Sequence, residues 1–222
     1  IGDCDEGKVL YPYNDKNFNL FTSIIESGEI LKGNTTKKDL RNYLIFGNKV
    51  PSCYSNRFYD TSKNKNLKIY KNSGYAIFND KNYKFIFDFG DLGLSPLFAH
   101  GHADSLSKKK KKNGYPFLID PGTYQYHRRF MKWRQYFKST LAHNTISVDN
   151  KSQAKSGGRM IWMNNVNSQL LNFEKSNEHF LIEAEHNGFK KQNINIFHKR
   201  KVTFKKNLGF IIQDELFGKG TH

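Results

Sequence analysis

The spacing of apolar residues changes from a helical to an alternating pattern along the chain. The segment 17–31 repeats small and apolar residues at three- and four-residue intervals, which predicts one helical face. The members of this face are Phe18, Phe21, Ile24, Ile25 and Gly28. The segment 35–47 opens with threonines that can cap a helix and ends at Gly47, a common helix stop. We therefore expect two short helices before residue 50.

From about residue 66, apolar residues alternate with polar ones, as they do in half-buried strands. Three short runs come first, separated by turns rich in Asn, Ser and Asp: Leu67–Tyr70, Tyr75–Phe78 and Tyr83–Phe89. Later runs cover 116–120, 143–149, 159–163, 179–186, 198–206 and 209–216. With strands at this spacing and no convincing long helix after residue 50, the pattern predicts a mainly β chain folded as an antiparallel β-sandwich.

These two patterns divide the chain into a helical lead-in, 1–50, and a sandwich, 51–222. Its 222 residues are enough for one large domain, or one domain with part of another. The opening IGDCDEGKVL has neither an initiator Met nor the features of a signal peptide, so we expect a piece of a longer protein whose localisation is unreadable. The last strands run into Gly218, so we also expect the sandwich to be truncated at its C-terminus.

The composition excludes some classes of protein and favours anionic partners. Aromatic residues make up 15% of the chain, which argues against disorder. The net charge of +16 attracts polyanions, and nucleic acid, an anionic membrane and acidic polysaccharide all fit. Abundant Lys beside Asn and Ile also looks like a compositional bias, so charge alone selects no partner.

Several common sites and anchors are absent from the sequence. No apolar run reaches the ~20 residues of a membrane-spanning helix. Neither nucleotide-loop pattern, GxxxxGK[ST] or GxGxxG, is present, and the GxSxG pattern of serine hydrolases is missing too. Cys4 and Cys53 are too few for a disulfide framework, so one bridge and two free thiols are both open.

A group of imidazoles and carboxylates is the first candidate for chemistry. Its members are His100, His102, Asp104, Asp120 and His143. His and carboxylate side chains are natural zinc ligands, and three of them leave a position open. If residues 100 and 102 lie on a strand, both imidazoles point to one side of it. On spacing alone a metal site competes with the commoner alternative, histidines hydrogen-bonded for structural reasons.

The segment 120–145 is the second candidate, because it mixes aromatic and basic residues after a Pro-Gly turn. Aromatic planes beside arginines suit a sugar ring that carries carboxylate or sulfate. The same mixture suits single-stranded nucleic acid, whose bases stack on aromatic rings. A loop that buries its aromatic residues and exposes its basic ones is the third alternative.

Four pieces of the chain, in this order, resemble the heparinase II/III-like family of polysaccharide lyases. They are LFAHGHADSLS (97–107), PFLIDPGTYQY (116–126), WRQYFKSTLAHNTISVD (133–149) and the Q-x3-G-G-x3-W pattern of Gln153–Trp162. The opening of the chain and the GYAIF run at 74–78 resemble the lead-in of that family. The resemblance therefore extends over most of the chain.

The resemblance implies an α/α toroid followed by a large β-sandwich, of which this chain would hold the toroid's last helices and the front of the sandwich. It implies a lyase that cleaves an acidic, uronate-containing glycan by β-elimination in the full-length protein. The family's tyrosine and asparagine belong to the toroid, so we expect the isolated chain to be inactive. A carbohydrate-binding module without activity, retaining a structural metal site, is the alternative. Family members are often periplasmic or secreted bacterial proteins.

The resemblance also implies roles for single residues. His100 matches the active-site histidine that faces the cleft. Three residues match the ligands of a structural zinc or other divalent metal: His102, Asp120 and His143. Asp104 would orient one of the ligand imidazoles. The remaining candidates, for contact with substrate, are Tyr124, Tyr126, Arg134, Tyr136 and Asn144.

One segment departs from the family, which has an alternating apolar strand where this chain reads Lys108–Lys112. The Asn113-Gly114 hairpin signal that follows is retained. Alternation would turn about half of these lysines inward, and burying an uncompensated ammonium costs several kcal/mol. Either the strand lies at an exposed edge, where Lys discourages pairing, or the run is an artefact of an adenine-rich reading.

Overall fold

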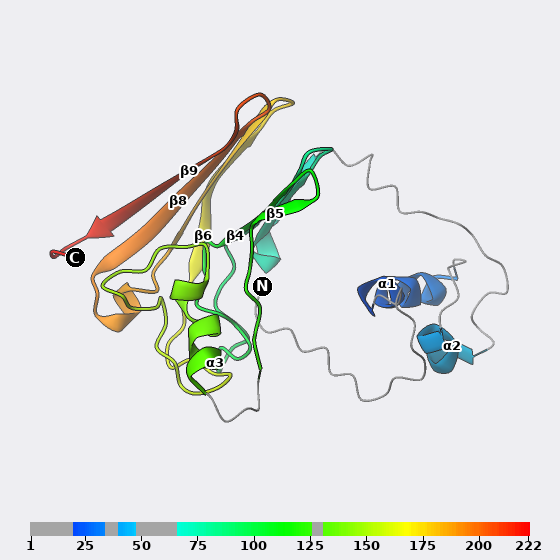
Figure 1. Ribbon diagram of the computed structural model, residues 1–222, viewed down its shortest axis with the longest axis horizontal. Helices are drawn as coiled ribbons and strands as arrows, with labels where there is room; N and C mark the ends of the chain where they lie inside the picture. The colour runs from blue at the N-terminus through cyan, green and yellow to red at the C-terminus, as the bar shows by residue number, and fades with distance from the viewer. Residues whose placement is uncertain (1–19, 34–39, 48–65, 126–130) are drawn as a thin grey trace. The chain divides into compact units, whose positions relative to one another are not determined.

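The structure, a computed structural model, describes residues 20–33, 40–47, 66–125 and 131–222 (Figure 1). They fall into two compact units, a helical pair and a β-rich unit that begins at residue 66. The pair consists of α1 (Leu20–Leu31) and α2 (Leu40–Phe46), which confirms the two predicted helices. The predicted boundary at residue 50 lies outside the described residues.

Polar contacts join the two helices. The Asn42 side chain is fully buried, and its amide donates a hydrogen bond of 3.1 Å to the carbonyl of Ser23. Phe21, Ile24 and Ile25, on the predicted apolar face of α1, are 72%, 48% and 53% exposed. The helices therefore form as predicted, but this apolar face stays open to solvent.

The β-rich unit contains two antiparallel sheets. One sheet has the order β1 (Asn66–Tyr70), β2 (Tyr75–Asn79), β3 (Tyr83–Asp88), β4 (Lys108–Lys112) and β5 (Tyr115–Leu118). The other has the order β6 (Ser168–Lys175), β7 (His179–His186), β8 (Ile196–Lys205) and β9 (Gly209–Gly218). The predicted fold class, a mainly β antiparallel sandwich preceded by short helices, is confirmed.

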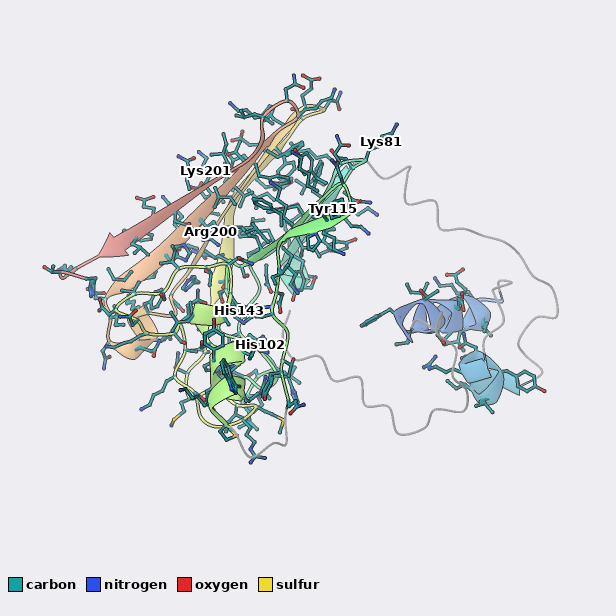
Figure 2. All side chains as sticks on the ribbon, viewed as in Figure 1. Lys81, His102, Tyr115, His143, Arg200 and Lys201 are labelled. Carbon is teal, nitrogen blue, oxygen red and sulfur yellow. The ribbon has the colours of Figure 1, made fainter. Side chains whose placement is uncertain are left out.

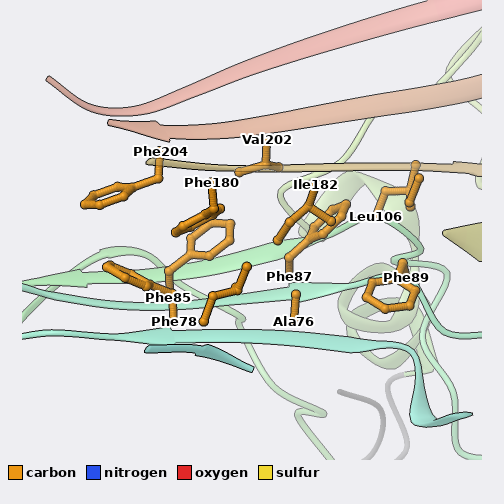
Figure 3. Packing of buried hydrophobic residues seen from close by; sticks show 12 residues of the cluster. Ala76, Phe78, Phe85, Phe87, Phe89, Leu106, Phe180, Ile182, Val202 and Phe204 are labelled. Carbon is orange, nitrogen blue, oxygen red and sulfur yellow. The ribbon is translucent and has the colours of Figure 1, made fainter. Parts of the chain in front are cut away.

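Aromatic side chains from both sheets fill the core between them (Figure 3). Phe78 of the first sheet lies 4.6 Å, between ring centroids, from Phe204 of the second. Phe85 and Phe87 are completely buried beside them. Phe180 stacks on Phe204 at 5.2 Å. The alternation that predicted strands thus also marks the inward faces of the sandwich.

Four elements differ from the sequence-based expectation: two predicted strands within the described residues are absent, and one helix and one strand were not predicted. Segments 143–149 and 159–163 are irregular and form only isolated bridges, because their polar groups are used on neighbouring loops. Trp162, for example, donates its indole N–H to the carbonyl of Gly101 at 2.9 Å. Helix α3 (Met131–Lys138) and strand β6 were not predicted. The aromatic residues of α3 resemble a strand in composition, whereas its two buried residues lie one helical turn apart.

The lysine run forms β4, and it is an interior strand. It pairs with β3 on one side and β5 on the other, so the exposed-edge alternative is wrong. Lys108 and Lys110 lie opposite the buried Phe87 and Phe85, as alternation predicts. Burial, followed by the charge of Arg200, lowers the pKa of Lys108 to about 8.

Aromatic rings offset part of the cost of turning the second lysine, Lys110, inward. The Lys110 ammonium lies 5.3, 5.2 and 4.9 Å from the ring centroids of three residues: Tyr83, Phe117 and Phe210. Cation–π attraction at such distances offsets part of the cost of desolvation. After β4 the chain turns with positive φ at both Asn113 and Gly114, as the hairpin signal predicts.

Candidate active site and metal site

A cleft of about 750 Å³ opens where β2 and β3 meet the 99–105 loop and the beginning of β6. Its walls are mostly polar and include Tyr75, Asp88, His100 and Asp104. His100 is exposed at this wall, and an imidazole can transfer a proton to or from a ligand.

The loop that carries His100 is irregular, so the expectation that residues 100 and 102 share one side of a strand is wrong. His100 is exposed with a left-handed φ of 60°, whereas His102 is only 2% exposed. The His100 N–H donates to the carbonyl of Met160 at 2.9 Å. A side chain at Gly101 would place its Cβ 2.7 Å from the nitrogen of Gly93, so only glycine fits between the two histidines. These contacts hold the backbone between the two histidines in a conformation that exposes one side chain and buries the other.

His102 is brought together with Asp120 and His143, as the resemblance implies. One potential ligand atom from each lies within 4.8 Å of the others, close enough for small side-chain adjustments to enclose one ion. Figure 2 shows His102 and His143 near α3, and their ring centroids are 5.1 Å apart. Two imidazoles and one carboxylate form a donor set that suits zinc best.

The hydrogen bonding of His143 fits a metal ligand. Its Nε2 lies 3.0 Å from the carbonyl of Phe137, which only accepts, so Nε2 carries the proton. Nδ1 then presents a lone pair, and it is a buried atom without a hydrogen bond in the structure. Burial lowers the pKa of His143, which favours the neutral imidazole that metals bind.

Asp120 and Asp104 supply the negative charge around this cluster. Asp120 Oδ1 accepts from the N–H of Gly122 at 2.8 Å, and Oδ2 lies 2.9 Å from the ammonium of Lys109. Although burial opposes ionisation, these contacts lower the pKa of Asp120 to about 2. Asp104 Oδ2 lies 3.9 Å from His143 Nδ1, too far for a hydrogen bond. In this geometry Asp104 contributes charge beside the imidazole, whereas its predicted orienting role stays a prediction.

Asn144 joins the loops that carry the cluster. Its amide donates to the carbonyls of Lys108 at 3.1 Å and Ile119 at 2.5 Å, the residues beside Lys109 and Asp120. These bonds tie the base of the β4–β5 hairpin to the loop that carries His143. The predicted contact between Asn144 and substrate stays a prediction, since the amide protons are used within the protein.

A family model described as heparinase II/III-like, C-terminal, matches residues 62–222. The chain belongs to this family. The assignment places the cleft and the histidine cluster in the C-terminal part of heparinase-like proteins, as the sequence motifs indicate.

Solved structures agree on the fold. A crystal structure of heparinase III superposes with a TM-score of 0.58 at 20% identity, covering 71% of this chain and 23% of that one. The heparan sulfate lyase HepC from Pedobacter heparinus gives a TM-score of 0.60 at 20% identity, covering 94% and 29%. The chain therefore spans less than a third of either protein. No curated protein matches, and none of the described helices is long and apolar enough to span a membrane.

In this heparinase-like domain, Arg134 is placed differently from the prediction of substrate contact. It is 1% exposed, and its guanidinium donates to the carbonyls of Thr123 and Arg159, each at 3.1 Å. A buried guanidinium that binds two backbone carbonyls cannot reach a ligand in the cleft. Arg134 instead fixes the start of α3 against the 123 and 159 loops.

Exposed aromatic rings gather around α3. Tyr124 and Tyr136, both predicted to contact substrate, are 43% and 44% exposed, and Tyr124 stacks on Phe137 at 5.5 Å. Trp133, 52% exposed, packs edge-on against Tyr136 at 6.2 Å. Tyr126 lies outside the described residues. The set of candidates omitted Trp133, although it lies in the same aromatic and basic segment.

The candidate set also omitted two cleft residues, Tyr75 and Asp88. Burial, followed by the nearby charge of Asp104, raises the pKa of Asp88 to about 7. Burial, followed by the charge of Asp88, raises the pKa of Tyr75. Their positions at the ends of two strands gave no signal in the sequence, because only the folded sheet brings them beside the histidine loop.

A buried polar network in the second sheet forms hydrogen bonds to the loops that carry the histidine cluster. Arg200 donates through Nη1 to the carbonyls of Leu106 and Asn144, each at 2.6 Å. Its Nη2 donates to Asp214 Oδ2 at 2.8 Å, and its Nε to Oδ1. Arg200 was not a sequence candidate, but it sits at an inward position of the alternation in β8, where a charge requires partners.

Two neutral histidines extend this network. The Gly188 N–H donates to His186 Nδ1 at 3.1 Å, so the His186 Nε2 proton points to His198 Nδ1, also 3.1 Å away. The His198 Nε2 proton then points to Asp214 Oδ1 at 2.8 Å. Burial is the main cause that lowers the pKa of both imidazoles. Asp214 ionises readily: although burial opposes this, hydrogen bonds from His198 and Arg200 lower its pKa.

Acid should therefore destabilise this domain in a specific pH range. His186 and His198 have folded pKa values below the unfolded value of about 6.5, so the unfolded chain binds more protons as the pH falls below it. We expect the contribution of these two imidazoles to stability to be intact above that pH and to be lost below it, by up to about 1.4 kcal/mol per pH unit for each histidine. Urea denaturation between about pH 7.5 and about pH 5.5 measures the slope.

Single variants distinguish the contribution of these imidazoles to the pH slope from that of other groups in the chain. His186→Gln should flatten the pH slope, whereas His179→Gln, at an exposed position of the same strand, should leave it unchanged. An unchanged slope in His186→Gln would show that this imidazole does not take up a proton on unfolding.

Proposed function

We propose that this chain is the metal-bearing sandwich part of a polysaccharide lyase that cleaves an acidic, uronate-containing glycan by β-elimination. One observation carries the proposal: His100 presents an exposed imidazole to a cleft beside the buried His102–Asp120–His143 cluster. Membership of the heparinase II/III-like family supports it, as does the similarity in fold to heparinase III and to a heparan sulfate lyase.

The reaction has three requirements. The C5 proton of a uronate becomes acidic enough only when the neighbouring carboxylate is neutralised, and a base must then remove it. An acid must protonate the oxygen of the leaving sugar. In our proposal His100 contacts the uronate at the reacting carbon and oxygen. Its imidazole would hold or move a proton there. The remaining acid–base groups would come from an upstream toroid of the same protein.

The charge and the aromatic surface of the domain suit such a substrate. A net charge of +16 draws a polyanion toward the protein. The exposed rings of Tyr124, Trp133 and Tyr136 offer flat apolar surfaces to sugar rings. We infer that these residues line the path of the glycan outside the cleft.

The metal has a structural role in this proposal. His102, Asp120 and His143 would hold a zinc or similar divalent ion, whose charge would fix the two loops and the hairpin that carry these ligands. The ordering would extend to His100, which is two residues from His102. This chain's residues would then bind and orient the substrate.

The decisive experiment follows the appearance of an unsaturated uronate by its ultraviolet absorbance. The full-length protein should generate this product from a uronate polymer, and His100→Ala should reduce kcat/KM by at least about 100-fold, the contribution of one general acid or base. His179→Ala, which changes an exposed histidine at the start of β7, is the matched control and should retain full activity.

The same assay tests the second candidate, a carbohydrate-binding module without activity. Binding of the uronate polymer by the full-length protein with no unsaturated product would favour that module and contradict the lyase. The 222-residue chain alone should bind but not turn over substrate, because the proposal places other acid–base groups upstream.

A further inference from the structure

Lys109 contacts a residue that the proposed metal site requires. It lies on the interior strand β4, and its ammonium is 2.9 Å from Asp120 Oδ2. The two side chains are 32% and 10% exposed, so the pair is partly shielded from solvent. An ion pair in such a position is stronger than one on an open surface.

The pairing changes the charge that an incoming cation meets. An imidazole brings no negative charge to a metal, so Asp120 supplies the only negative charge within the set His102, Asp120 and His143. The ammonium of Lys109 balances that charge at hydrogen-bond distance. A divalent cation would therefore enter a donor set that is already neutral, and it would approach a positive charge.

We propose that Lys109 is a built-in competitor for the divalent metal, holding Asp120 when the ion is away and lowering the affinity of the His102–Asp120–His143 site. The inference rests on the metal site of the proposed function. The Lys109 side chain is partly exposed, so its ammonium can move into solvent when an ion binds. The site would then release and rebind its metal more readily than the same site in a chain without this lysine.

The lysine run supplies its own control. Lys111 lies two residues from Lys109, so alternation turns both side chains to the outer face of the sheet. Lys111 is exposed, and it has no recorded ion pair with Asp120 in the structure. Removing its charge changes the net charge of the chain by the same amount without touching the ligand set.

The test is a zinc titration of the full 222-residue chain in competition with a chromophoric chelator. Lys109→Gln should bind zinc about 10- to 100-fold more tightly than the wild type, the range for removing one like charge next to a site. Lys111→Gln should stay within about twofold, because solvent and salt screen an exposed charge. Lys109→Arg, which retains the charge, should bind zinc as weakly as the wild type.

The outcomes are distinguishable. Zinc affinity of Lys109→Gln equal to or below that of the wild type overturns the proposal, and a lower affinity would mean that Lys109 supports Asp120. Binding by the variant alone supports it. Circular dichroism of the metal-free proteins checks folding, and Lys109→Met provides a second neutral side chain. If no protein binds zinc, the metal site and this inference both fail, while the lyase assay of the full-length protein still decides the proposed activity.

Discussion

Replacing Arg200 with methionine is expected to lower the free energy of unfolding of this chain by about 3–5 kcal/mol, as breaking a buried ion pair does. The variant removes both donors to Asp214, together with the hydrogen bonds to the carbonyls of Leu106 and Asn144. Among the described residues, Asp214 would keep its hydrogen bond from His198. Two carbonyls on the loops near the candidate site would lose a charged donor.

Urea denaturation measures this loss, with Lys201→Met as the matched control. Figure 2 shows Lys201 next to Arg200 on β8, and alternation turns its side chain to the opposite face. The control should change stability by no more than about 0.5 kcal/mol. Equal losses in the two variants would contradict the role of Arg200, because removal of one positive charge would then be sufficient.

A double variant separates the ion pair from the loop contacts. Arg200→Met combined with Asp214→Leu removes both charges, so no uncompensated carboxylate remains at that position. We expect the double variant to recover part of the stability that Arg200→Met loses. The remainder would measure what the hydrogen bonds to Leu106 and Asn144 contribute.

Zinc is expected to stabilise the chain by about 2.7 kcal/mol at a concentration near 100 times its Kd, since it binds the folded state. For a domain of this size the gain corresponds to a rise in Tm of roughly 5–10 °C. His143→Gln should abolish the rise, because it replaces the imidazole whose Nδ1 lone pair faces the cluster. Thermal unfolding with zinc and with a chelator measures both effects.

Two further variants make this result specific. Asp120→Asn should lose most of the zinc-induced rise, since it removes the only negative charge of the ligand set. His179→Gln should retain the full rise, because His179 is an exposed residue at the start of β7. A rise of the same size in His143→Gln would mean that zinc binds elsewhere, for example at exposed histidines.

The lysine strand shows how far the sequence pattern extends. Alternation predicted that about half of the lysines turn inward, and Lys108 and Lys110 do so. The pattern offered only an edge strand or an artefact, because the compensation comes from residues distant in sequence. The ring of Phe210, on the second sheet, lies over Lys110. No local pattern predicts a cation–π contact between two sheets.

Arg134 and Arg200 show the same limit from the other direction. Both are arginines in sequence, and composition suggests that arginines in this basic chain face an anionic ligand. Burial decides otherwise, since both are nearly inaccessible and spend their donors on backbone carbonyls or on Asp214. The residue type determines which contacts are possible, and the packing of the folded chain determines which of them form.

The sequence by itself determined the fold class, the family and which three residues would cluster as candidate metal ligands. Hydrophobic period and motif order are local properties, and local properties are what a sequence displays directly. Tertiary structure alone decided that β4 is an interior strand, that Lys109 pairs with Asp120, and that Arg200 ties the second sheet to the ligand loops. These contacts depend on which strands pair and which side chains lose their water, and both depend on the whole chain folding together.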